Sequence, residues 1–191
     1  SKYCYRCTFA SNLCFMFERK VVLYIAMSVD GYIATTDGDL GFLSSVARDR
    51  EDYGYTAFTA TVDTVIMGRK TYDKVLSMGY DYPHPDKKSY IITRTQQPAR
   101  GNIEFYTGNM KDLVLKLKGE AGKDIYCDGG AETVKLLMLE GLIDEFIISV
   151  IPVVLGDGIA LFRQGIPRHE LKLIGCQSFE SGLVQLHYAK M

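Results

Sequence analysis

The sequence predicts an α/β fold in which a mixed sheet of about eight strands is flanked by about four helices. From Lys20 onward, short apolar runs rich in β-branched residues alternate with stretches of helical periodicity, the pattern of strands joined by helical crossovers. Near the end of the chain, alternating runs at 171–178 and 183–189 flank a turn at 180–182 and predict an antiparallel hairpin.

Length and composition fit one globular domain. The chain has 191 residues, of which 47% are hydrophobic and 24% charged, proportions that require neither a metal nor a disulfide for folding. The formal net charge of −1 excludes a nucleic-acid-binding protein that works through overall charge. No run of 18 apolar residues occurs, so no transmembrane helix is predicted.

The elements of the first half follow from the apolar patterning. Residues 21–27 form a continuous apolar run, short enough for a buried strand. Tyr53, Ala57 and Ala60 recur at helical spacing and predict a helix over 48–60. The other elements expected here are strands at 64–67, 89–93 and 103–106 and a helix at 71–78.

The second half continues the alternation. Leu113, Val114 and Leu117 share one side of a helix expected over 110–118. The other expected elements are strands at 124–127 and 145–151, a helix at 131–139 and the closing hairpin. The segment 151–162 is apolar and interrupted by glycine, so it packs either in the core or against a second copy of the chain.

Residues 1–19 are interpreted as an N-terminal extension, non-native or disordered, that precedes a single domain at 20–191. An ordered arm is the alternative. The extension holds Cys4, Cys7 and Cys14, and the odd total of five cysteines at irregular spacing excludes a disulfide framework. Cys4 and Cys7 have the spacing of half a zinc knuckle, but no second pair follows, so no metal site is predicted. Reduced thiols are typical of a cytoplasmic protein.

Ligands of open α/β sheets bind beyond the carboxyl ends of the strands, and one strand end here has residue types that suit a phosphate. It consists of Gly68, Arg69, Lys70 and Thr71. The glycine permits a tight turn, the helix start offers free N–H groups, and the arginine can bind a phosphate with two donors. The alternative is a glycine turn with two solvated cations.

Two further strand ends reinforce this interpretation. Thr93 and Arg94 follow the next strand; alone they are more typical of a surface strand end, but a nucleotide with an extra ribose phosphate needs several converging donors. Gly129 and Gly130 stand between a strand and a helix and permit close approach of a pyrophosphate. They match neither the dinucleotide fingerprint nor the Walker A loop, and a simple tight turn is the alternative.

A turn pair, Asp30 and Gly31, follows the first strand and returns apolar residues to the same end of the sheet. Asp30 either orients a ligand there or holds its own backbone in an Asx turn.

Four segments resemble the dihydrofolate-reductase-like proteins, in the group that contains the C-terminal reductase domain of the bifunctional riboflavin-biosynthesis deaminase/reductase. The segments are 21–34, 62–72, 125–162 and 182–190, and they follow the order and spacing of that family. The resemblance runs from about Lys20 to Met191. It implies an eight-stranded, mostly parallel sheet with an antiparallel C-terminal hairpin, and NADPH as the hydride donor.

The resemblance also implies roles for residues that bind the cofactor. The nicotinamide side would be lined by Ala26, Ile33 and Ala34. The adenine-side phosphates would be held by Gly68, Arg69, Lys70 and Thr71, with Arg69 on the 2′-phosphate and with Thr93 and Arg94 flanking the adenosine. The pyrophosphate would lie against Gly129, Gly130, Ala131 and Glu132.

The residues expected near the substrate match the family less closely than those expected near the cofactor. Dihydrofolate reductases place a carboxylate on the helix before the 62–72 segment. The acids expected on that helix here are Asp49, Glu51 and Asp52, of which Asp52 falls nearest to the family position. Ser149 resembles the hydroxyl that accompanies this carboxylate. Riboflavin-pathway reductases use the turn of Ser28 and Asp30 near the substrate. The candidate catalytic residues are therefore Asp30, Asp52 and Ser149. No zinc-deaminase signature is present, so the bifunctional role is not expected.

The expected function is NADPH-dependent reduction of a small pterin- or pyrimidine-like heterocycle by hydride transfer. A true dihydrofolate reductase and a nucleotide-binding module without catalysis are the alternatives. The choice of NADPH over NADH depends on Arg69 and Arg94. The resemblance favours a homodimer, and neither a nucleic acid nor a membrane is an expected partner.

Overall fold

A computed structural model of the chain describes residues 19–79 and 81–191. Residues 1–18 of the expected extension, with Cys4, Cys7 and Cys14, lie outside this described part. The main sheet is built from β1 (Val21–Ser28), β3 (Val62–Gly68), β4 (Lys88–Ile92), β5 (Ile103–Tyr106), β6 (Asp124–Gly129), β7 (Glu145–Ile151), β9 (Leu171–Ser178) and β10 (Val184–Lys190). Each expected strand is present, and no boundary differs by more than two residues.

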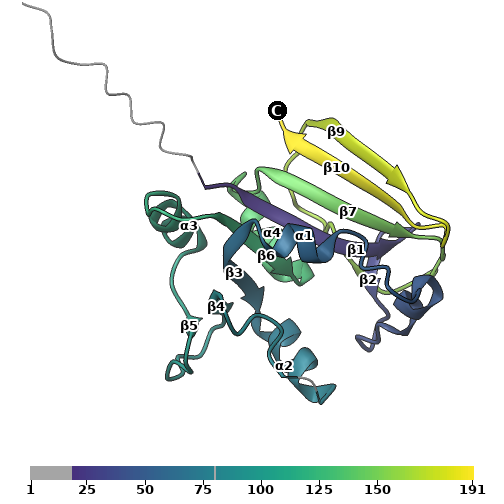
Figure 1. The fold of residues 1–191 in the computed structure, drawn as a ribbon. Helices are drawn as coiled ribbons and strands as arrows, with labels where there is room; N and C mark the ends of the chain where they lie inside the picture. The colour runs from purple at the N-terminus through teal and green to yellow at the C-terminus, as the bar shows by residue number, and fades with distance from the viewer. Residues whose placement is uncertain (1–18, 80) are drawn as a thin grey trace, which may run out of the picture.

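The eight strands have the order β5-β4-β3-β6-β1-β7-β10-β9 (Figure 1). The pairs from β5 across to β7 are parallel, and β10 is antiparallel to both β7 and β9. The mostly parallel sheet with its antiparallel C-terminal hairpin confirms the predicted fold class. A small second sheet, which the sequence did not predict, pairs β2 (Tyr32–Ala34) with β8 (Ile159–Ala160).

Helices cover both faces of the sheet. They are η1 (Gly41–Val46, a 3₁₀ helix), α1 (Tyr55–Thr59), α2 (Arg69–Ser77), α3 (Met110–Lys118) and α4 (Ala131–Leu139). Phe58 of α1 and Tyr72 of α2 belong to the apolar cluster on one face, whereas Leu113 of α3 and Val134 of α4 belong to the cluster on the other. Helices α3 and α4 have the predicted bounds, and α2 begins two residues earlier than predicted.

The helix predicted over 48–60 is wrong in its first half, because only the short α1 forms there. Arg50 and Tyr53 have φ values of 64° and 56°, which are incompatible with a continuous right-handed helix. Asp52 precedes α1 and accepts a hydrogen bond from the backbone N–H of Thr56 at 3.0 Å. Residues 48–54 are therefore a loop that ends in a helix cap.

The parallel strands diverge toward their carboxyl ends. β1 pairs with β6 only over Val21–Leu23, but with β7 from Val22 to Ser28. Figure 1 shows β1 and β7 running side by side while β3 turns away from them. The crossover after β3 passes through α2 on one face to β4, and the crossover after β6 passes through α4 on the other face to β7. The junction of β3, β6 and β1 is therefore a topological switch point, where α/β sheets bind ligands.

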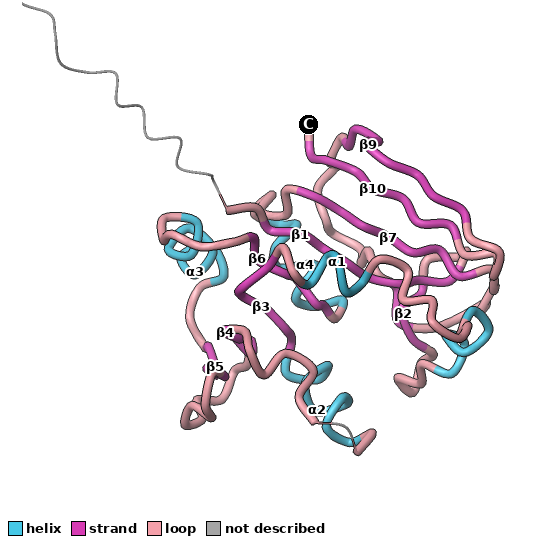
Figure 2. The backbone as a smooth tube through the Cα atoms, viewed as in Figure 1, coloured by secondary structure: helices cyan, strands magenta, loops and turns pink. Residues whose placement is uncertain are grey.

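Loops and a short helix gather at the carboxyl end of the central strands, where the strands diverge. Figure 2 shows loop segments and η1 gathered at the carboxyl end of β1 and β7. The segment 151–162 lies partly in the core, since Ile151 and Leu161 are buried while Val154 and Phe162 are exposed. Its contact with a second copy of the chain stays a prediction. Within the described residues, no helix has the length and apolar character needed to cross a membrane.

Arg19, which the sequence assigned to the extension, is an anchored part of the fold. The residue is 4% exposed, and its guanidinium donates to the Leu117 carbonyl at 3.1 Å and to the Thr64 hydroxyl at 2.7 Å. It also pairs with Asp63. A buried arginine needs such partners, so Arg19 fixes the start of β1 against β3 and α3.

Candidate active site

Two helix N-termini meet at the switch point, and both are capped by glycine. Gly68 precedes α2 and Gly130 precedes α4, and neither helix has a side chain that caps its first N–H groups. The first turn of an α-helix has backbone N–H groups without an internal partner and carries a partial positive charge. Two such ends, each on a nine-residue helix, suit an anion with several oxygens.

The two helix starts are packed against each other reciprocally. A Cβ placed on Gly68 would lie 2.7 Å from Oγ1 of Thr133 in α4, and a Cβ on Gly130 would lie 2.9 Å from Oγ1 of Thr71 in α2. Gly129, in cis peptide linkage to Gly130, has a φ of 90°, which favours glycine. The glycines thus let the two crossovers approach closely, and the cradle fits a pyrophosphate.

Arg69 is held in place beside this cradle. Its Nε donates to both carboxylate oxygens of Asp73, at 2.7 and 2.8 Å, and its guanidinium carbon lies 5.4 Å from the centre of the Phe105 ring. Because Asp73 occupies Nε, the two terminal nitrogens remain available for a phosphate. Lys70, the next residue, is exposed and makes no ion pair with any described residue.

The end of β4 brings more positive charge to the same side. Thr93 closes a local turn, since its Oγ1 accepts from the backbone N–H of Thr95 at 3.2 Å. Arg94 is exposed, and within residues 19–79 and 81–191 no acid pairs with it. Arg100 lies 5.8 Å from the same Phe105 ring that Arg69 contacts. Arg100 was not among the predicted site residues, and a local bridge between Arg100 and Ile103 sets its place before β5.

The first residues of α4 differ in their surroundings. Ala131 is buried, whereas Glu132 is exposed and pairs with Arg163. That pairing offsets the negative charge that Glu132 would otherwise bring next to a bound phosphate.

The three residues expected on the nicotinamide side are not in one cluster. Ala26, on β1, packs with the cluster that contains Ile151 and Leu183, next to η1. Ile33, on β2, packs against the core on the opposite face, and Ala34 is 5% exposed. The structure therefore brings Ala26 to the diverging part of β1 and β6 but directs Ile33 toward the core on the other face.

Asp30 holds two loops together. Its carboxylate accepts from the Ser28 hydroxyl at 2.6 Å and from the backbone N–H groups of Leu155 at 3.1 Å and Gly156 at 2.7 Å. The Ser28 hydrogen bond, followed by these two amides, lowers the pKa of Asp30 below its ordinary value. The ionised Asp30 therefore holds the turn after β1 against the loop at 155–156, and both of its carboxylate oxygens already have partners.

Asp52 and Ser149 are separated from each other. Asp52 is exposed and caps α1, and hydrogen bonds from Thr56 lower its pKa. Ser149 lies on β7 at 4% exposure, and its Oγ accepts from Nε2 of Gln185 at 3.1 Å. No hydrogen bond joins Asp52 to Ser149 among the described residues.

A third carboxylate, which the sequence analysis did not name as a candidate, lies directly beside the diglycine. Asp128 accepts from the Tyr126 hydroxyl at 2.7 Å and lies 3.0 Å from Nε2 of His84. The His84 side chain is 2% exposed and the Asp128 side chain 21%. Burial, and then the Asp128 charge, raise the pKa of Tyr55 to about 12, and burial also raises the pKa of Tyr126 well above its ordinary value. Both hydroxyls therefore stay protonated at neutral pH.

The signal for Asp128 was present in the sequence as the acid that directly precedes Gly129. His84 comes from a loop 44 residues away and could be linked to Asp128 only through the fold. Cys127, the neighbouring buried thiol, has its pKa raised to about 12 by burial and is not an available nucleophile. No cluster of three or more metal-ligating side chains occurs among the described residues.

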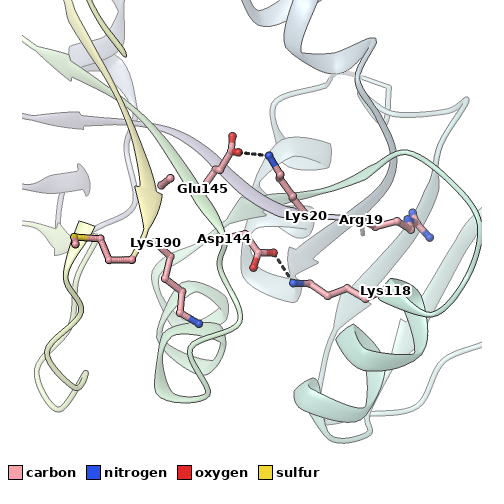
Figure 3. A pocket seen from close by; sticks show the side chains of 8 residues that line it. Arg19, Lys20, Lys118, Asp144, Glu145 and Lys190 are labelled. Carbon is pink, nitrogen blue, oxygen red and sulfur yellow. Dashed lines mark hydrogen bonds and ion pairs between the residues drawn. The ribbon is translucent and has the colours of Figure 1, made fainter. Parts of the chain in front are cut away.

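A hollow at the opposite edge of the sheet has a different character. It has a volume of about 380 Å³ and lies at the amino end of β1 and β7 (Figure 3). Lys20 pairs with Glu145 and Lys118 with Asp144, each at 2.6 Å, and Lys190 donates to the Gly141 carbonyl at 2.6 Å. Because these cations are already partnered, the hollow is an ion-pair network and not the phosphate site.

Comparisons with known proteins identify the family to which the chain is related. The RibD C-terminal domain family matches residues 19–185. The Bacillus subtilis (strain 168) protein YwjB is 43% identical over 174 residues, covering 91% of this chain and 99% of that protein. YyaP of the same organism is 34% identical over 182 residues, covering 90% and 95%.

Solved structures show the same fold. A Shewanella sp. PV-4 protein described as a riboflavin biosynthesis protein superposes with a TM-score of 0.82 at 30% identity, covering 90% of this chain and 99% of its own. The Thermotoga maritima diaminohydroxyphosphoribosylaminopyrimidine deaminase/5-amino-6-(5-phosphoribosylamino)uracil reductase superposes with a TM-score of 0.68 at 13% identity. This chain spans 57% of that longer protein, and 92% of this chain is covered. The chain belongs to the RibD C-terminal domain family.

Proposed function

We propose that the protein is an NADPH-dependent reductase that transfers a hydride to a small heterocycle of the pterin or pyrimidine class. The observation that carries the proposal is the reciprocal packing of the helix starts at Gly68 and Gly130, beside the fixed guanidinium of Arg69. A paired cradle of this kind suits a dinucleotide pyrophosphate at a switch point. Membership of a family with reductase relatives supports the same class of reaction.

The cofactor would lie across the carboxyl edge of the sheet. The N–H groups at the starts of α2 and α4 would bind the pyrophosphate, and Arg69, assisted by Arg94, would bind the 2′-phosphate that distinguishes NADPH from NADH. The nicotinamide would enter between the diverging ends of β1 and β6, against Ala26. When bound, the reduced nicotinamide supplies the hydride, and the protein orients the reactants and excludes water.

The reduction of a C=N or C=O bond adds a hydride to the carbon and a proton to the heteroatom. Asp128 is the carboxylate that we propose delivers this proton, because it directly precedes Gly129 at the proposed cofactor site and its partners are the side chains of Tyr126 and His84. Asp30 and Asp52 instead accept from backbone amides and hold loops in place. His84 is a positioning residue that holds the second oxygen of Asp128. The proton can be replaced from solvent, since Asp128 is partly exposed.

A screen of NADPH oxidation against pterins, aminopyrimidines and small carbonyl compounds tests the proposal. Saturable NADPH binding together with oxidation by one of these acceptors is the expected result. Absence of NADPH binding would contradict the proposal. Turnover of dihydrofolate with inhibition by methotrexate would instead identify a dihydrofolate reductase, and binding without any acceptor would identify a module that lacks catalysis.

A further inference from the structure

Strand register places a line of polar side chains beside the proposed nicotinamide position. Ala26 on β1 is directly opposite Ser149 on β7, which is opposite Gln185 on β10, which is opposite Gln177 on the edge strand β9. The hydrogen bond from Gln185 to Ser149 shows that these two side chains share one face of the sheet. Two polar groups therefore lie one and two strands away from Ala26.

The orientation of the Gln185 amide is determined by its contacts. Nε2 donates to the Tyr53 backbone carbonyl, to the Tyr24 hydroxyl and to Ser149 Oγ, each at 3.1 Å. The Tyr53 carbonyl can only accept a hydrogen bond, so the nitrogen must face it. Burial raises the pKa of Tyr24, and its hydroxyl donates to the same Tyr53 carbonyl at 2.8 Å.

This arrangement leaves one acceptor and one donor without a protein partner. Across residues 19–79 and 81–191, no donor reaches Oε1 of Gln185, and Ser149 accepts from Gln185 but donates to no acceptor. Ser149 is 4% exposed and its Oγ already has one partner in Gln185, whereas Gln185 is half-buried. Each side chain keeps one unused hydrogen-bonding function, the proton of the Ser149 hydroxyl and the Oε1 lone pairs of Gln185. An acceptor and a donor side by side are complementary to a ring N–H next to a ring carbonyl.

We propose that Gln185 and Ser149 form the specificity-determining pair of the site and bind the lactam edge of the substrate, an N–H beside a C=O in the ring. The inference rests on the proposed function and sharpens it, because it selects oxo-pteridines and oxo-pyrimidines over heterocycles without a lactam N–H. Gln185 Oε1 accepts from the ring N–H, and the Ser149 hydroxyl donates to the neighbouring carbonyl.

Calorimetric titration of the NADP⁺-saturated protein with lumazine (pteridine-2,4-dione) tests the pair. The comparison ligand is 1,3-dimethyllumazine, which has the same rings and carbonyls but no ring N–H. Lumazine is expected to bind about tenfold or more tightly than the dimethyl compound, as the loss of a buried hydrogen bond predicts. Equal affinities, or no binding of lumazine, would overturn the inference.

Variants test whether lumazine binding depends on Gln185 and Ser149 and not on other polar residues of the same sheet face. Gln185→Met and Ser149→Ala are each expected to weaken lumazine binding about tenfold. Gln177→Met, the same change one strand further out on the exposed β9, is the matched control and is expected to leave the affinity unchanged. Thermal melting shows whether each variant is folded. Because Ser149 and Gln185 lie on different strands, one variant remains informative if the other misfolds.

NADPH affinity distinguishes the possible failures. Unchanged NADPH binding in Gln185→Met, with loss of lumazine binding, is the expected result. Weaker NADPH binding in that variant would mean that the pair contacts the carboxamide of the cofactor and would overturn the lactam assignment while leaving the reductase proposal intact. A wild-type protein that binds no NADPH would refute the proposed function, and with it this inference.

Discussion

At the scale of single residues, the candidate site depends on short-range steric fits and on charge. Gly68 and Gly130 are needed because a Cβ at either position would collide with a threonine hydroxyl of the other helix. Arg69 is useful because Asp73 and Phe105 fix it before a ligand arrives, which reduces the entropy lost on binding. Asp128 is useful because it combines partial exposure with a buried histidine partner.

Arg69→Ala is expected to weaken NADPH binding by about 10- to 100-fold, the effect of losing a charge-assisted hydrogen bond to phosphate. NADH, which lacks the 2′-phosphate, should bind the variant as it binds the wild type. Fluorescence titration with both dinucleotides measures the difference. An unchanged affinity for NADPH would show that the 2′-phosphate lies elsewhere.

Asp128→Asn is expected to lower kcat by about 100-fold or more, because a positioned proton donor typically contributes at least that factor. Asparagine retains an oxygen for Tyr126 and cannot supply the proton. NADPH affinity should be unaffected, which separates a catalytic loss from a misfolded site. If Asp52→Asn or Asp30→Asn shows the large fall in kcat and Asp128→Asn does not, the proton source has been assigned to the wrong carboxylate.

At the scale of elements, the strands, α3 and α4 could be predicted because their signals are local. The glycines at the ends of β3 and β6 and the cations that follow β3 and β4 could be predicted for the same reason. The failure over 48–60 has an equally local cause: spacing alone cannot reveal the positive φ values of Arg50 and Tyr53. Pairs such as His84 with Asp128 and Ser149 with Gln185 were missed because strand register and loop packing bring them together from 44 and 36 residues apart.

Asp30 makes the turn after β1 and the loop at 155–156 sensitive to acid. Its pKa is lowered, first by Ser28, so the ionised carboxylate stabilises the folded state; this stabilisation is complete above the ordinary value of 3.8 and is lost as the pH falls through the lowered folded value. Urea midpoints are expected to fall below about pH 4. They should fall less steeply in Asp30→Asn, and equal slopes in the two proteins would contradict this role of Asp30.

At the scale of the whole molecule, the two edges of the sheet have different chemistry. The amino edge holds ion pairs that neutralise one another around the hollow. The carboxyl edge presents glycine-capped helix starts and Arg69, whose terminal nitrogens are left available by its pairing with Asp73 through Nε. The divergence of β1 from β6 opens only the carboxyl edge. The topology therefore favours the carboxyl edge for the phosphate site that we propose.

The exposed apolar side chains of the edge strand β9 lead us to expect that the protein self-associates. Leu173 and Ile174 are 51% and 48% exposed there, and exposed apolar edges are usually covered. Light scattering is expected to give a mass of about twice 21.4 kDa, and the double variant Leu173→Glu, Ile174→Lys should be monomeric. Lys172→Glu on the same strand is the control that should remain dimeric. A monomeric wild type, or a double variant that stays dimeric, would contradict this interface.

The most direct test of the central claim is a crystal structure of the protein with NADP⁺. We expect the pyrophosphate at roughly 3 Å from the first backbone N–H groups of both α2 and α4, the distance of an ordinary hydrogen bond. The 2′-phosphate should lie on Arg69, and the nicotinamide should lie between the diverging ends of β1 and β6. A dinucleotide bound at the amino edge, or a pyrophosphate that contacts neither helix start, would contradict the account.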